Sequence, residues 1–353
     1  KISTDVQSFV TGSTVVAGSA SLKADDTSEI TGFAGSASLA AAFGGVGVAV
    51  SIGLAVASND IGNRVEAYVN TSSVTTTSGD LLIQALENAK IDAVSTAASA
   101  ALSGGIFSVS VSGGGASATN TIQNTTRAYV VQSPLNVHGN LTLEASETDT
   151  ALAKVDTLSA AVGLISISAG GSVAIGMATP IVEAYTDNLT NITAGGAMLV
   201  SAKAKPRVEV EALGVNAGTL AVGVSTATST VSPTVRAFVG GSDRTITAGS
   251  LTVTASHALP STGYSAKAKT TGSAGGLIGV DATVSNAVNS STVRSFVQDG
   301  TTLNITGATV VSGDNSTKQY AEANSTTAAT TGPARAPRPA SSMPPSTVTS
   351  WAK

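Results

Sequence analysis

Histidine is the side chain best suited to acid–base or metal chemistry, and this sequence has two, His138 and His257. They lie far apart in the chain and at different positions of the repeat described below. A Ser-His-Asp triad or a His-based metal site needs further polar partners beside the histidine. The sequence identifies none, and it lacks G-x-S-x-G, P-loop and G-x-G-x-x-G motifs. We therefore expect both histidines to be isolated, solvated turn residues.

Carboxylates cluster weakly in two places, at Asp25-Asp26 and at Glu144, Glu147 and Asp149. Carboxylate oxygens are calcium ligands, but the Gly-Gly-x-Gly-x-Asp nonapeptide of calcium-binding β-rolls is missing. We expect solvated turn acids rather than a metal site. Polysaccharide lyases and hydrolases built on β-helices need acids and bases gathered on one face, whereas charged residues here recur by repeat. The sequence thus predicts no catalytic, cofactor-binding or metal-binding residue, and no enzyme.

The composition favours a thin, regular, extended body. The 353 residues are 42% hydrophobic, but only 3% are aromatic and 11% are charged, against about a quarter charged in an average chain. The apolar content comes mostly from Ala and Val, whose short side chains fill a thick core poorly. The net charge of −4 shows no basic surplus, so nucleic acid is not an expected partner.

An internal repeat organises the chain. Three markers recur together about every 57 residues, which is typical of solenoids and arrays. The first is an aromatic strand: VQSFV (6–10), VEAYV (65–69), RAYV (127–130), VEAYT (182–186), VRAFV (235–239) and VRSFV (293–297). The second is a strand that usually opens with glycine: SASLKA (19–24), GDLLIQA (79–85), GNLTLEA (139–145), GAMLVSA (196–202), GSLTVTA (249–255) and GATVVSG (307–313). The third is a glycine turn between two long strands, as at Gly44-Gly45 and Gly104-Gly105.

Period-2 alternation of β-branched with small polar residues predicts strands throughout. We therefore predict an all-β fold, an elongated β-solenoid (parallel β-helix-like) whose units form long flat arches around the glycine turns. One coil per unit is preferred to several. The solenoid should cover residues 1–322, with boundaries near 6, 65, 126, 182, 235 and 293, as five complete units and a partial one. Residues 323–353, which hold half of the ten prolines, should form a tail, either a linker or a strap on a neighbour.

If one unit makes one coil, equivalent residues stack along the axis as ladders. The aromatic ladder would comprise Phe9, Tyr68, Tyr129, Tyr185, Phe238 and Phe296. Two residues earlier in each unit stand Gln7, Glu66, Arg127, Glu183, Arg236 and Arg294. Glu66, Arg127, Glu183 and Arg236 alternate in sign, which favours stacking on adjacent strands, and Arg294 breaks the alternation.

One stretch, 30–59, has no charged residue and imitates a membrane span. Its Gly44-Gly45 break and its Gly, Ala and Ser content instead predict β-structure, so no span is expected.

The stretches VEAYVNTSSVTTTSGDLLIQA (65–85) and VRAFVGGSDRTITAGSLTVTA (235–255) resemble repeats of filamentous-haemagglutinin-like and leukotoxin-like adhesins, which are very large bacterial surface proteins. The resemblance covers about residues 1–322. It implies an extracellular β-solenoid rod for attachment or matrix building, and it brings no catalytic residues. A secretion domain, a translocator barrel and a binding head are not recognised in this sequence.

These observations predict an extracellular or cell-surface structural segment, a fibre, stalk or sheath, that self-assembles head-to-tail or joins adjacent repeats of a larger chain. The alternative is an adhesin module that recognises a host or matrix glycan, or a protein, on a solenoid face. An aromatic patch outside the ladder would favour that alternative. The remaining Phe and Tyr residues are scattered in the sequence: Phe33, Phe43, Phe107, Tyr264 and Tyr320.

Overall fold

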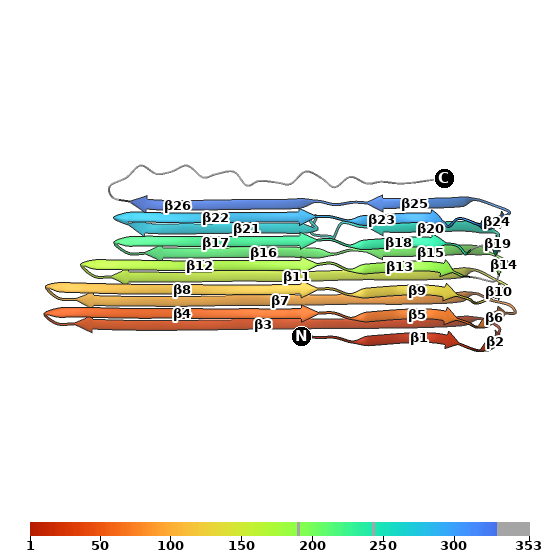
Figure 1. The fold of residues 1–353 in the computed structure, drawn as a ribbon, viewed down its shortest axis with the longest axis horizontal. Coiled ribbons are helices and arrows are strands. Elements are labelled where there is room, and N and C mark those ends of the chain that lie inside the picture. Colours follow the sequence, from red (N-terminus) through yellow and green to blue (C-terminus); the bar gives the residue numbers. More distant parts are fainter. Residues whose placement is uncertain (189–190, 242–243, 330–353) are drawn as a thin grey trace.

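The computed structural model describes residues 1–188, 191–241 and 244–329, and it confirms the all-β solenoid. Its strands form four sheets, and every strand pair is parallel (Figure 1). One repeat unit makes one coil, because Phe9 pairs with Tyr68 and Tyr68 with Tyr129 in the unit after it. None of the described residues forms a helix long and apolar enough to cross a membrane.

The first three coils contain four strands each. The first coil has β1 (Asp5–Thr11), β2 (Thr14–Ala17), β3 (Ala20–Phe43) and β4 (Val46–Ile61). The second has β5 (Arg64–Asn70), β6 (Ser73–Thr76), β7 (Leu81–Gly104) and β8 (Phe107–Ile122). The third has β9 (Thr125–Val131), β10 (Leu135–Val137), β11 (Leu141–Val162) and β12 (Ile165–Ala178).

In the later coils the long strand divides in two. The fourth coil has β13 (Ile181–Asp187), β14 (Ile192–Ala194), β15 (Ala197–Ala204), β16 (Arg207–Ala217) and β17 (Leu220–Val231). The fifth has β18 (Thr234–Val239), β19 (Arg244–Ala248), β20 (Ser250–His257), β21 (Ala266–Gly276) and β22 (Ile278–Asn289). The sixth has β23 (Thr292–Val297), β24 (Thr301–Ile305), β25 (Thr309–Asn315) and β26 (Gln319–Ala329).

We name the four sheets by their place in the coil. The aromatic sheet is β1-β5-β9-β13-β18-β23, and the corner sheet is β2-β6-β10-β14-β19-β24. The long sheet contains β3, β7 and β11 with the divided strands of the later coils, and the return sheet is β4-β8-β12-β17-β22. The long sheet packs against both the return sheet and the aromatic sheet, so each coil is a flattened loop. At about 3.3 Å per residue, the 24 residues of β3 span roughly 80 Å, against about 29 Å for six stacked coils. The described part is therefore longer across its axis than along it.

The corner strands lie between the aromatic strand and the long strand of each coil. Each is short, and an apolar side chain faces inward, as Val74 and Ile192 do. The residue that opens this corner has positive φ in successive coils, at Gly12, Thr71, Gln132 and Asn188. The Val and Ile residues that follow each aromatic strand in the sequence could have predicted this corner strand.

The interior changes character along the coil. Between the aromatic, corner and long sheets lies a core of larger side chains such as Leu81, Ile83 and Val65. Farther out, the long and return sheets form a thin arm filled by Gly, Ala and Ser. There, Ser99 Oγ lies 2.8 Å from Ser112 Oγ across the arm, and a Cβ on Gly53 would lie 2.6 Å from the Ala98 carbonyl oxygen. The small side chains let the two sheets lie close, as their composition suggested.

The sixth coil extends beyond the boundary expected at residue 322. Strand β26 runs from Gln319 to Ala329 and pairs in register with β21, so the sixth unit has the first strand of its arm. The sequence signal was weak here because β26 is rich in Ala, Thr and Asn rather than Val and Ile. The rest of the predicted Pro-rich tail, residues 330–353, lies outside the described residues.

Candidate functional site

The six predicted ladder aromatics lie in one column on the outer face of the aromatic sheet. Successive ring centroids are 4.8–5.2 Å apart, and their planes differ by 2–10°. The rings face outward because the alternate residues of these strands, such as Val65, Ala67 and Val69, are buried inside. Phe9 at the first coil is 51% exposed, whereas the rings of the later coils are partly covered by their neighbours. The column fixes the register of each coil on the next.

A column of charged residues runs beside the rings. Arg127 Nε donates to Glu183 Oε2 at 2.8 Å, and one of its terminal nitrogens lies 3.5 Å from Glu66 Oε1. Arg236 continues the column with a 3.4 Å contact to Glu183 Oε1. Glu66 Oε2 also accepts a hydrogen bond from a terminal nitrogen of Arg64 at 2.5 Å, and the Glu66 side chain is only 2% exposed. All four residues of the predicted charge ladder are therefore linked, and Arg294 lies instead over the ring of Phe296 at 5.5 Å.

The electrostatics of these columns follow from the packing. Burial alone would lower the pKa of Arg127, but its hydrogen bond and ion pairs with Glu183 and Glu66 outweigh that effect and raise it. Burial raises the pKa of Tyr129, and it raises the pKa of Tyr185 to about 12. The columns are therefore an arrangement of fixed charges and neutral rings, which is suited to holding coils together.

The expectation of solvated turn acids is wrong, because all five residues lie within the long strands β3 and β11, and three of them lie on the inner faces of these strands. Glu147 and Asp149 lie within β11 on its inner face and are buried, and Asp26 lies within β3 and is half-buried. They join Glu87 and the amides of Asn63 and Asn124 in what we call the buried polar chain (Asp26, Asn63, Glu87, Asn124, Glu147 and Asp149). Asp25 is exposed, and Glu144 lies on the outer side of its strand.

Side-chain amides connect the carboxyl groups of the buried polar chain. Asn63 Nδ2 donates to Asp26 Oδ2 at 2.9 Å and to Glu87 Oε1 at 3.1 Å. Asn124 Nδ2 donates to Glu87 Oε1 at 3.2 Å and to Asp149 Oδ1 at 3.3 Å. The two asparagines were not predicted, although each stands directly before an aromatic strand at the same position of the repeat.

Burial raises the pKa values of three carboxyl groups in the buried polar chain. It raises the pKa of Glu87 to about 8, against the weaker opposing effect of the Asn63 hydrogen bond. Burial also raises the pKa of Glu147 and that of Asp149, whose carboxyl groups lie close enough to share a proton. Among the described residues, no Lys, Arg or His forms an ion pair with these carboxyl groups, and no cluster of acids, His and Cys has metal-binding geometry.

The two histidines differ from each other. His138 lies exposed in a turn, as expected. His257 does not: it ends β20 with its side chain buried, and its Nδ1 lies 2.8 Å from Ser291 Oγ. Burial lowers the pKa of His257 to about 4, so this imidazole is neutral at physiological pH.

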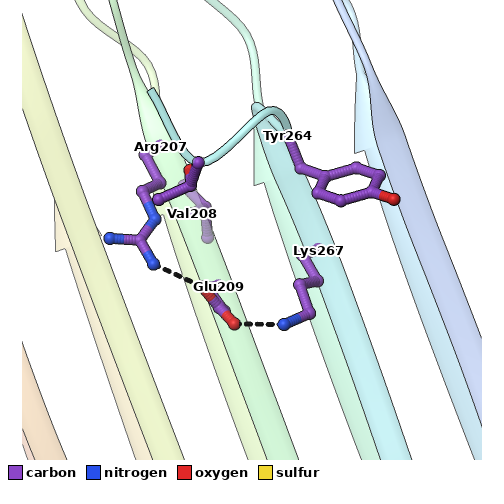
Figure 2. A pocket seen from close by; sticks show the side chains of 6 residues that line it. Arg207, Val208, Glu209, Tyr264 and Lys267 are labelled. Atoms are coloured by element: carbon purple, nitrogen blue, oxygen red, sulfur yellow. Dashed lines mark hydrogen bonds and ion pairs between the residues drawn. The ribbon is translucent and has the colours of Figure 1, made fainter. Parts of the chain in front are cut away.

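A small pocket of about 330 Å³ lies where the long sheet is interrupted. Figure 2 shows its charged wall, in which Glu209 stands between Arg207 and Lys267. Tyr264, on the loop before β21, also lines the pocket, and its ring points away from Arg207. Burial opposes ionisation of Glu209, but its two cationic neighbours prevail and lower its pKa. Outside the pocket wall, Tyr264 contacts Tyr320 at 5.6 Å between ring centroids, and Lys318 Nζ lies 4.7 Å from the Tyr264 ring.

Two of the five scattered aromatics are thus brought together. The contact between these two rings could not be predicted from the repeat, because Tyr264 belongs to a loop that interrupts the repeat, whereas Tyr320 belongs to a strand. The remaining three, Phe33, Phe43 and Phe107, are exposed on the arms.

No protein-family model, no curated protein and no solved structure matches this chain.

Proposed function

We propose that this chain is a structural module, a segment of an extracellular fibre, stalk or sheath of a bacterial surface protein. The observation that carries the proposal is the pair of outer ladders, which join each coil to the next through stacked rings and alternating charges. Such a body gains its stability from nearest-neighbour contacts, so further coils can be added without a new core. We assign it no catalytic activity. The bacterial and extracellular setting rests on the resemblance of its repeats to those of large adhesins.

The strands at the two ends of the described stack support an assembly role. Strands β1 and β3 pair on one side only, and so do β23 and β25 at the other end. Open parallel edges of this kind are templates for a further coil, which a second copy or adjacent repeats of a larger chain would supply. In a continuous stack of copies, Phe296 of one copy would lie against Phe9 of the next, and Arg294 against Gln7.

This geometry predicts that Gln7→Arg shortens head-to-tail filaments without destabilising the monomer. Within one chain the new arginine lies beside Glu66, its register partner, which is favourable. Across the junction it meets Arg294, which is unfavourable. Cryo-electron microscopy of the purified chain should show wild-type filaments with a repeat of about 29 Å per copy, six strand spacings.

Gln123→Arg is the matched control, because it adds the same charge at an exposed position between the second and third coils, away from both ends. It should leave filament length unchanged. Separate particles of the wild-type chain at every concentration would contradict head-to-tail assembly.

The second candidate is an adhesin module, and the pocket beside Tyr264 is the observation that favours it. A half-buried ring next to paired cations and a carboxylate is a surface on which a host or matrix glycan could stack and form hydrogen bonds. Glycan binding that is lost in Tyr264→Ala and kept in Phe33→Ala would support this candidate over the structural one.

A further inference from the structure

The outer face of the return sheet reverses the usual distribution of side-chain size. In β4, the inward residues are Gly47, Ala49, Ser51, Gly53 and Ala55. The outward residues are large and apolar, and each is 56–73% exposed: Val46, Val48, Val50, Ile52, Leu54 and Val56. The arm interior is too thin for larger side chains, because a Cβ on Gly47 would already lie 2.9 Å from the Ala42 carbonyl oxygen. The apolar residues of this strand are therefore directed to the surface.

The strand register extends this apolar face over all five return strands. Val50 starts a column that continues through Val111, Ile167, Leu220 and Ile278. Sixteen large apolar side chains of the return sheet are exposed: Val46, Val48, Val50, Ile52, Leu54, Val56, Phe107, Ile165, Ile167, Val173, Ile175, Val222, Val224, Ile278, Val280 and Val284. At roughly 60 Å² each, they present about 1,000 Å² of apolar surface.

The same face carries almost no charge. The return strands contain two charged residues, Asp60 and Asp281. Asp60 lies at the inner end of β4 and pairs with Lys1 at 3.0 Å, whereas Asp281 points into the arm and accepts a hydrogen bond from Ser325 at 2.8 Å. The outer face of the long sheet differs, since it carries ion pairs such as Lys90–Glu29 and Lys154–Asp156.

We infer that the return sheet is a lateral interface on which the return sheet of a second copy of this chain packs face to face. The exposed apolar area exceeds both the roughly 300–600 Å² of the largest patch on an ordinary monomer and the roughly 800 Å² per partner that a stable interface needs. The matching surface must be flat, apolar and uncharged, and the same sheet of a second copy has all three properties. Stacked sheets in β-sandwiches pack in this way, about 10 Å apart.

The relief of the face also suits a two-fold arrangement. Across the sheet, Ile52 pairs with Gly113, Gly113 with Ala169, and Ala169 with Val222. The next outward row has Leu54, Gly115, Gly171 and Val224. In these two rows, large side chains on β4 and β17 flank small ones on β8 and β12, so the ridges of one copy can face the low part of the other. This packing is perpendicular to head-to-tail stacking and does not depend on it.

The test compares two fourfold variants of the full chain in sedimentation-velocity ultracentrifugation. The first replaces Ile52, Leu54, Val222 and Val224 with Thr on the return sheet. The matched control replaces Phe33, Leu39, Leu158 and Val162 with Thr on the outer face of the long sheet, where they are 49–75% exposed. Threonine keeps β-propensity, and thermal unfolding checks that both variants fold. Combining each variant with Gln7→Arg weakens head-to-tail association equally in every sample of the comparison.

We expect the Gln7→Arg chain and its long-sheet variant to dimerise with a Kd of about 1 µM or tighter. The return-sheet variant should dimerise at least about 100-fold more weakly. Three results would overturn the inference: a monomeric Gln7→Arg chain, equal loss of pairing in both variants, or binding of the monomer to neutral lipid vesicles through the return sheet.

Discussion

The folded chain is expected to lose stability as the pH rises from about 4.5 to about 8. Burial raises the pKa of Glu87 to about 8, and it also raises the pKa values of Glu147 and Asp149. In this range the unfolded carboxyl groups are ionised, while the folded ones keep their protons. The unfolded state therefore binds fewer protons, and the free energy of unfolding falls with pH. This contribution to stability is fully present below pH 4.5 and is lost as the pH passes the raised values in the folded state. His257, whose pKa burial lowers to about 4, acts in the opposite direction up to about pH 6.5 and offsets part of the loss.

The effect is large because each pH unit of this difference costs about 1.4 kcal/mol per group. Glu87 alone should remove about 4 kcal/mol, and the Glu147–Asp149 pair should add to it. Glu87→Gln keeps an oxygen that can accept from Asn63 and Asn124 but has no proton to lose. It should match the wild-type chain near pH 4.5 and exceed its stability above pH 8.

Urea unfolding across this pH range measures the effect. Glu211→Gln is the control, since Glu211 is exposed on the long sheet, and it should leave the profile unchanged. Stability that rises between pH 5 and 8, or a Glu87→Gln profile parallel to that of the wild type, would show that the buried polar chain is not protonated in the folded state.

Reversing the charge of Arg127 should have the second large effect. Arg127 connects Glu66, which is 2% exposed, with Glu183, which is 12% exposed. Arg127→Ala leaves these carboxylates without their shared partner and should cost about 2 kcal/mol. Arg127→Glu places three carboxylates on adjacent strands and should cost about 2 kcal/mol more, because like charges directly opposite repel each other.

Arg294→Glu is the matched control for this prediction. Arg294 pairs in register with Arg236, so the same charge reversal there creates an attraction, and stability should stay equal or increase. Chemical denaturation of the three variants measures these differences in the free energy of unfolding. Equal stability of Arg127→Ala and Arg127→Glu would mean that the charge column contributes little to coil stacking.

The sequence was sufficient for the parts of the fold that repeat. The spacing of Phe9, Tyr68 and Tyr129 predicted the coil, and the register of β1, β5 and β9 places these rings above one another. Repetition is informative because a parallel stack brings equivalent residues together. The interruption before β21 is longer than those before β16 and β26, so the pocket beside Tyr264 does not repeat and could not be predicted in this way.

The buried acids and His257 were predicted wrongly for a different reason. Charged and polar residues were assigned to turns by type, although Glu147 and Asp149 follow Leu141, Leu143 and Ala145 at intervals of two and so share their buried face. The return sheet shows the converse. Its large apolar residues face solvent because mostly Gly, Ala and Ser fill the narrow space between the sheets, and this thickness comes from tertiary packing rather than from the pattern of one strand.

The central claim, that one repeat unit forms one coil, is most directly tested by a distance between two spin labels. The cysteine-free chain allows labels at Lys23→Cys and Thr254→Cys, which occupy the same register position four coils apart. With one coil per unit, the two backbone positions are about 19 Å apart. Double electron–electron resonance should give a distance distribution centred near this value and broadened by the label linkers. A distance near 38 Å would require two coils per unit and would contradict both ladders.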